Sequence, residues 1–123
     1  MKKNPKILLA EDDKFISRAY KDGLTRAGFD VSVAIDGNEA LAQIKTVKPD
    51  LMLLDLIMPV KNGFEVLEEL QKSKENKSPI IVLSNLGQES DIQRAKDLDA
   101  TDYLIKSNVT LKEVIDKIKS YLK

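Results

Sequence analysis

The sequence predicts an α/β fold in which a parallel β-sheet is covered by helices on both faces. Short apolar runs of four or five residues alternate with longer segments whose apolar residues recur at helical spacing. Three of the short runs are apolar at every position, which is typical of strands buried on both faces of a sheet. The alternation occurs five times, so we expect five strands, each followed by a helix.

The first part of the chain contains two such units. A strand is expected at 7–10, and the helix that follows it ends at Gly28, a residue type that commonly terminates helices. The run 31–35 alternates in the manner of a strand, and Asp36, with Glu39 three residues on, can cap the next helix. The first helix has apolar residues at helical spacing, namely Phe15, Ile16, Ala19, Leu24 and Ala27. The second would bury the stripe of Ala40, Leu41, Ile44 and Val47.

Three further strands are expected, at 51–54, 80–83 and 103–105. A helix begins at Asn62 after the first of them, and a weakly apolar helix follows the second. Thr110 and Glu113 have the spacing of a capping box for the last helix. The apolar stripes of these helices are Phe64, Leu67 and Leu70; Ile92, Ala95 and Leu98; and Leu111, Val114, Ile115, Ile118 and Leu122.

Length and composition limit the possible functions. The 123 residues correspond to one domain, 1–123, and 42% apolar with 33% charged residues suffice for a buried core. Twenty basic and twenty acidic residues give a net charge of zero, which argues against direct binding of nucleic acid. No apolar run approaches the ~18 residues of a membrane helix, and the N-terminus is unlike a signal peptide, so neither is expected.

The chain contains neither cysteine nor histidine. Disulfides, thiolate or imidazole catalysis, Ser-His-Asp triads and metal sites built from these two residue types are therefore excluded. Any chemistry must be carried out by carboxylates, hydroxyls, lysine, arginine or the backbone.

Polar residues stand where the predicted strands end, and ligands of parallel α/β sheets bind beyond these carboxyl ends. The four groups are Glu11-Asp12-Asp13, Asp55, Ser84-Asn85 and Lys106. If the strands 7–10 and 51–54 are neighbours, three carboxylates converge on one pocket, and Lys106 alone does not balance their charge. A hard divalent cation such as Mg²⁺ would balance it, because Mg²⁺ prefers oxygen ligands.

Magnesium held by carboxylates implies phosphate chemistry nearby. A carboxylate can attack a phosphoryl group and form an acyl phosphate. The metal and Lys106 can neutralise phosphoryl oxygens, and the Ser84 hydroxyl can donate a hydrogen bond to one of them. Simpler roles exist for each residue alone, since an acidic triplet before a helix often caps it and Asp55 could merely end a strand. Their common position at one edge of the predicted sheet favours a functional pocket.

The sequence resembles the receiver domain of two-component response regulators over essentially its whole length. The residues that carry the resemblance are 7–13, 36–41, 49–59 with Gly63, 79–84 and 100–106. The most specific signal is the segment from Asp55 to Gly63, in register with the acidic cluster, Ser84 and Lys106. The resemblance implies a flavodoxin-like, doubly wound sheet of five parallel strands in the order 2-1-3-4-5 with five helices.

The resemblance also implies how the acidic residues act. Asp55 would accept a phosphoryl group from a partner sensor histidine kinase or phosphotransfer protein. Glu11 and Asp12 match the acidic pair of the Mg²⁺ site, with Asp12 as a direct ligand and Mn²⁺ as a substitute metal. Asp55 and the backbone carbonyl of Ile57 match further metal ligands.

The remaining matches concern a switch. Ser84 matches the switch hydroxyl, Lys106 the lysine that senses the phosphoryl group, and Tyr103 the aromatic residue that changes rotamer on activation. The implied function is a phosphorylation-controlled switch in a cytoplasmic signalling pathway rather than an enzyme. It would relay the signal to a downstream protein through the face built from the fourth helix, fifth strand and fifth helix, as a monomer or a weak homodimer.

Three residues depart from the family pattern. Ser107 stands where the family usually has a proline joined by a cis peptide, so we expect a trans Lys106-Ser107 peptide. Asn85 replaces a residue that is usually small and would narrow the site. Asp99 stands where a glycine often occurs, and it would take up the left-handed backbone conformation.

Two functions of other classes remain as alternatives. An Asp-nucleophile phosphohydrolase of the haloacid-dehalogenase type needs a second Asp two residues after the nucleophile, where this sequence has Ile57. A flavodoxin-like cofactor binder needs a Ser/Thr/Gly phosphate loop after the first strand. This sequence has Glu11-Asp12-Asp13 there, which would repel phosphate without a metal.

Overall fold

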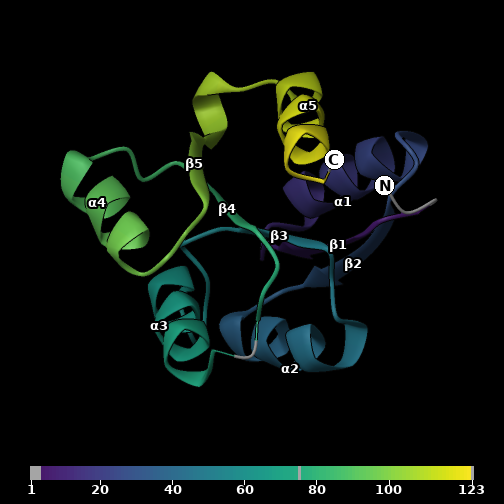
Figure 1. Ribbon diagram of the computed structural model, residues 1–123. Helices are drawn as coiled ribbons and strands as arrows, with labels where there is room; N and C mark the ends of the chain where they lie inside the picture. Colours follow the sequence, from purple (N-terminus) through teal and green to yellow (C-terminus); the bar gives the residue numbers. More distant parts are fainter. Residues whose placement is uncertain (1–3, 75, 123) are drawn as a thin grey trace.

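The computed structural model describes residues 4–74 and 76–122, and within them five parallel strands and five α-helices alternate along the chain (Figure 1). The strand order is β2-β1-β3-β4-β5, which confirms the predicted order. Residues 1–3, 75 and 123 of the predicted domain lie outside the described residues. The elements are β1 (Lys6–Ala10), α1 (Lys14–Arg26), β2 (Asp30–Ala34), α2 (Gly37–Val47), β3 (Leu51–Leu54), α3 (Gly63–Ser73), β4 (Ile80–Ser84), α4 (Glu89–Asp97), β5 (Asp102–Ile105), a 3₁₀ helix (Lys106–Asn108) and α5 (Leu111–Tyr121).

Helices cover both faces of the sheet, as Figure 1 shows for α1 and α5 on one side and α2 and α3 on the other. Successive strand residues point to opposite faces, so the buried side chains divide into two clusters. Leu8, Met52 and Val82 pack with the cluster of α2, α3 and α4. Leu9, Leu53, Ile81 and others pack with Leu24 of α1 and with Val114 and Ile118 of α5. Every residue of β3 and β4 is buried, as predicted for strands covered on both faces.

The predicted strand bounds are correct for β3 and differ by one residue at the ends of the other four strands. One difference concerns the site, because Ser84 is the last residue of β4 rather than the residue after it. The 3₁₀ helix was not predicted, since three residues are too few to show a hydrophobic period. The described α-helices contain 9 to 13 residues, and none of them is both long and apolar enough to span a bilayer.

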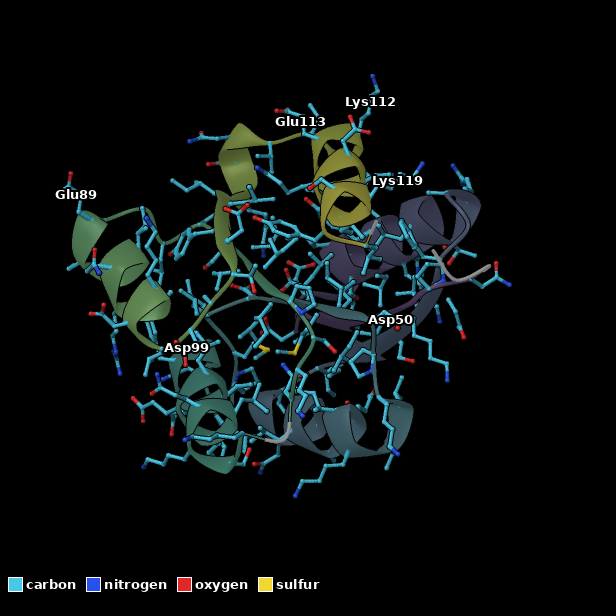
Figure 2. The ribbon with its side chains drawn as sticks, in the orientation of Figure 1. Asp50, Glu89, Asp99, Lys112, Glu113 and Lys119 are labelled. Atoms are coloured by element: carbon cyan, nitrogen blue, oxygen red, sulfur yellow. The ribbon has the colours of Figure 1, made fainter. Side chains whose placement is uncertain are left out.

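The helix ends show the predicted capping. Asp36 Oδ1 accepts a hydrogen bond from Glu39 N at 2.8 Å at the start of α2. Thr110 and Glu113 form a reciprocal capping box at the start of α5, where Figure 2 labels Glu113. Gly28 follows the end of α1 with φ +101°, a conformation that glycine adopts without a steric cost.

Asp99 has the left-handed conformation that its position predicts, with φ 68°. Its carboxylate accepts a hydrogen bond from Gln71 Nε2 at 3.1 Å, and the same amide donates to Asp97 O at 2.9 Å. These contacts join the end of α4 to α3, the two helices beside which Figure 2 labels Asp99. An aspartate tolerates this conformation better than most residues because its short polar side chain finds local hydrogen bonds.

Gly63 allows the start of α3 to pack closely against Asp55 and Leu56, the residues that follow β3. Its backbone N–H donates to Leu56 O at 3.0 Å. A Cβ atom at this position would lie 2.5 Å from Asp55 O and 2.7 Å from Leu56 Cα, distances at which the backbone would have to move. Glycine at this position therefore permits the close approach of α3 to the backbone of Asp55 and Leu56.

Asp102 attaches β5 to α5, and we expect Asp102→Asn to lower the free energy of unfolding by about 1 kcal/mol at neutral pH. The Asp102 carboxylate accepts hydrogen bonds from Tyr121 Oη at 2.8 Å and Tyr103 N at 2.8 Å, and Lys117 Nζ lies 3.4 Å away. Burial raises the pKa of Asp102, but these partners outweigh it and hold the pKa below its ordinary value of 3.8. A lowered pKa means that the contribution is complete above pH 3.8 and is lost as the pH falls further.

The measurement is urea unfolding of wild type and variant from neutral pH to below pH 3.8. The difference between them should disappear at the acidic end. Asp116→Asn, which changes an exposed carboxylate of α5, is the matched control and should change little. A difference that persists undiminished at the lowest pH would show that the charge of Asp102 is not its cause.

Candidate functional site

The register of the sheet places Glu11 and Asp55 next to each other. Ala10 pairs with Leu54 at the ends of β1 and β3, so the two acidic residues follow on neighbouring strands. Hydrogen bonding continues past the strand ends, because Asp55 N donates to Ala10 O at 3.0 Å and Glu11 N donates to Ala34 O at 2.9 Å. The backbone therefore holds both residues at the carboxyl edge of the sheet, where the sequence predicts the site.

Lys106 bridges these two carboxylates from the end of β5. Its Nζ donates to Asp55 Oδ2 at 3.0 Å and also to Glu11 Oε1. Both carboxylates are largely shielded from water, since Glu11 is only 3% exposed and Asp55 is 6% exposed. Burial lowers the pKa of Lys106, but the hydrogen bonds to Glu11 and Asp55 outweigh it and leave the pKa raised. Lys106 is therefore positively charged at neutral pH.

One ammonium does not neutralise the carboxylates that meet here. Burial raises the pKa of Glu11 more than the hydrogen bond from Lys106 lowers it, and the negative charge of Asp55 raises it further. Oxygen atoms of Glu11, Asp12 and Asp55 lie within 4.8 Å of one another. Clustered carboxylate oxygens with an excess of negative charge suit a small, hard divalent cation. The donor set therefore fits the predicted Mg²⁺.

The acidic triplet after β1 serves two purposes. Asp13 caps α1, because its Oδ1 accepts from Phe15 N at 2.9 Å and from Ile16 N at 3.0 Å. Glu11 is buried, and its Oε2 accepts from Asp13 N at 3.2 Å. Asp12 is exposed at the mouth of the carboxylate cluster. The capping interpretation thus applies to Asp13, while Glu11 and Asp12 belong to the predicted metal site.

The backbone of Ile57 lies against the Asp55 carboxylate. Ile57 N donates to Asp55 Oδ1 at 3.2 Å, and the Ile57 side chain is 56% exposed. Asp55 Oδ1 is thus held by Ile57 and Oδ2 by Lys106, so the carboxylate has a fixed orientation. The role of the Ile57 carbonyl as a metal ligand stays a prediction.

Ser84 and Tyr103, the predicted switch residues, both contact Leu86. The buried Ser84 Oγ accepts from Leu86 N at 3.4 Å, and Tyr103 Oη donates to Leu86 O. Burial, and then the negative charges of Asp91 and Asp55, raise the pKa of Tyr103. The loop that follows β4 therefore connects the two switch side chains. Sequence reasoning missed this link because it uses only the backbone of Leu86, which every residue type would provide.

Two of the departures from the family pattern are in contact with each other. Ser107 N donates to Asn85 Oδ1 at 2.9 Å, although the residues are 22 positions apart. The described residues contain no cis peptide bond, so the Lys106-Ser107 peptide is trans, as expected. A proline at 107 would have no N–H to donate, so this hydrogen bond depends on the departure itself.

Comparisons with known proteins show which family the chain matches. The family model of the response regulator receiver domain matches residues 7–119. The transcriptional regulatory protein PrrA of Mycobacterium leprae is 36% identical over 120 residues, which cover 98% of this chain and 51% of that protein. The transcriptional regulatory protein CpxR of Klebsiella pneumoniae is 39% identical over 118 residues, which cover 96% and 49%. The chain thus spans about half the length of these relatives.

Solved structures show the same similarity. The receiver domain of the Francisella response regulator 1452 superposes with a TM-score of 0.90 at 34% identity, covering 97% of each chain. A CheY-like receiver domain protein from Methanospirillum hungatei gives a TM-score of 0.89 at 27% identity, covering 97% of this chain and 94% of that one. These matches give no support to a haloacid-dehalogenase-type phosphohydrolase. The chain belongs to the response regulator receiver domain family, the phosphoryl-accepting signalling domains of two-component systems.

Proposed function

We propose that Asp55 is the phosphoryl acceptor of this receiver domain, and that a sensor histidine kinase or a phosphotransfer protein is the donor. The observation that carries the proposal is the oriented Asp55 carboxylate, which is buried at the sheet edge between Lys106 and the backbone of Ile57. A carboxylate oxygen of Asp55 would form a bond to the phosphorus of a phosphohistidine while the P–N bond breaks and the imidazole leaves.

Asp12, Asp55, Glu11 and the Ile57 carbonyl would hold Mg²⁺, which Mn²⁺ could replace. When bound, the metal supplies positive charge for the phosphoryl oxygens that approach this acidic cluster. Lys106 already contacts Asp55 Oδ2 and can turn its ammonium to a phosphoryl oxygen. The Ser84 hydroxyl, which accepts only a long hydrogen bond from Leu86 N, would donate to another.

The signal would leave through the face formed by α4, β5 and α5. Movement of Ser84 toward the phosphoryl group would disturb Leu86, and Leu86 O is the partner of the Tyr103 hydroxyl. Ala95 is the only buried residue of α4, so few apolar contacts oppose a shift of this helix. The recipient is a downstream protein rather than nucleic acid, given the zero net charge. The same face would support a weak homodimer.

The proposed role of Asp55 as phosphoryl acceptor also implies where the domain acts and how it acts. Residues 1–123 act as one receiver domain in the cytoplasm, where response regulators meet their kinases. The domain changes the binding of a partner and does not turn over a substrate as an enzyme.

Acetyl phosphate is expected to phosphorylate the wild-type protein once per chain, on Asp55, and only with Mg²⁺ or Mn²⁺ present. The clustered carboxylates would otherwise repel a phosphoryl dianion. Intact-mass and peptide mass spectrometry with and without EDTA measure the stoichiometry and the position. A generic phosphate ester should show no catalytic turnover. A phosphoryl group on another residue would refute the assignment, and repeated turnover would favour the phosphohydrolase alternative.

A further inference from the structure

The 3₁₀ helix Lys106–Asn108 receives its cap from a distant part of the chain. The first N–H groups of a helix have no partner within it. Such groups are usually capped by the residue before the helix, but here that residue is Ile105, whose side chain carries no acceptor. The amide oxygen of Asn85 accepts from Ser107 N at 2.9 Å in its place.

The hydrogen bond between Ser107 N and Asn85 Oδ1 lies directly beyond the last paired residues of β4 and β5. Ser84 and Ile105 are the last register pair of β4 and β5, and Asn85 is the next residue after Ser84. The Asn85 side chain therefore links the segments that follow β4 and β5, beyond the point where the pairing of the two strands ends. Lys106 stands between Ile105, which is held in β5, and Ser107, which is held by Asn85.

This location matters because a lysine side chain has a long and flexible stem. The Lys106 ammonium reaches Glu11 and Asp55 across the sheet edge, and it can do so reproducibly only if the backbone of Lys106 is fixed. Asn85 is exposed, so its amide contributes by this hydrogen bond rather than by packing in the core.

We propose that Asn85 is a positioning residue for Lys106, and through Lys106 for transfer of a phosphoryl group to Asp55. The inference rests on the proposed function of Asp55. It also couples the loop after β4 to the loop after β5, because Asn85 lies between Ser84 and Leu86. These two residues contact each other, and Leu86 O also accepts from Tyr103 Oη. A shift of the loop after β4 would thus pull on the residue next to Lys106.

Asn85→Ala is expected to lower the rate constant of phosphorylation by acetyl phosphate about five-fold at saturating Mg²⁺, the effect of one lost hydrogen bond. The affinity for Mg²⁺ should stay unchanged, because the clustered carboxylates do not depend on Asn85. In ¹H–¹⁵N spectra of protein labelled at lysine with ¹⁵N, the Lys106 ammonium signal of Asn85→Ala should be weaker than that of wild type. The reason is that a less firmly positioned ammonium exchanges its protons with water faster. That signal is identified by its loss in Lys106→Met.

Asn108→Ala is the matched control, since it removes an exposed amide from the same 3₁₀ helix and should change none of these quantities. An Asn85→Ala protein with the wild-type rate and the wild-type Lys106 signal would overturn the inference. A parallel loss of Mg²⁺ affinity would also overturn it, because Asn85 would then support the whole site. The Lys106 signal tests the positioning role even if wild type is not phosphorylated on Asp55, an outcome that would refute only the proposed function.

Discussion

Asp55→Asn is expected to abolish phosphorylation by acetyl phosphate, with a loss of at least about a hundredfold in rate. The amide is nearly the same size and keeps an oxygen to accept from Ile57 N, so the local backbone should persist. It has no carboxylate to attack phosphorus, and it reduces the negative charge that attracts a divalent cation. Intact-mass spectrometry after incubation with acetyl phosphate and Mg²⁺ measures the effect. Undiminished labelling of the variant would mean that another residue is the acceptor.

Asp12→Ala should suppress the same reaction through the metal. Asp12 is the exposed member of the carboxylate cluster, so its removal takes away a proposed metal ligand without uncovering the buried Glu11 and Asp55. We expect labelling to recover in part as the Mg²⁺ concentration is raised. The neighbouring variant Asp13→Asn is the control, because asparagine caps helices as well as aspartate does. Equal suppression by Asp13→Asn would indicate a general effect of charge rather than loss of a ligand.

The fold could be predicted from the sequence because its signals are local. The stripe of α5 and the capping box of Thr110 and Glu113 lie within one short segment, and the structure confirms both. The continuous apolar runs of β3 and β4 likewise reflect burial on both faces. The pairing of β1 with β3, by contrast, joins segments that are far apart in the sequence, so no local pattern predicts it. The residues alone leave this pairing open, and the resemblance to receiver domains implies the strand order that the structure confirms.

The site was predicted as a set of residues but not as a set of contacts. Residue types alone could not separate Asp13, which caps α1, from Asp12, which joins the carboxylate cluster, because the path of the chain after β1 decides between them. The contacts of Leu86 and Ser107 use backbone groups, which leave no trace in the sequence. Asn85 and Ser107 were recognised as departures from a pattern, yet only the structure shows that they are partners.

The phosphorylated form of the protein is expected to be long-lived, and Ile57→Asn should accelerate its decay about tenfold. In receiver domains, the side chains two positions after the acceptor and two after the switch hydroxyl flank the path of the hydrolytic water. Here they are Ile57 and Leu86, neither of which can hold a water molecule by a hydrogen bond. Ile57 lies at the Asp55 carboxylate with its apolar side chain exposed. A single hydrogen bond to the attacking water, worth roughly 1.4 kcal/mol of barrier, corresponds to a tenfold change in rate.

Asn85→Ala tests whether the apolar side chains of Ile57 and Leu86 explain the long lifetime, because the Asn85 amide is a polar group of the same loop that could orient the water instead. The Asn85 oxygen is already engaged by Ser107 N, which leaves it poorly placed to activate a nucleophile. We therefore expect Asn85→Ala not to slow the decay, even though the same variant slows phosphorylation. Loss of the phosphoryl group, followed by mass spectrometry after removal of acetyl phosphate, compares wild type with both variants. If wild type decays within seconds and Asn85→Ala prolongs its lifetime, then Asn85 orients the water and the apolar side chains of Ile57 and Leu86 do not set the lifetime.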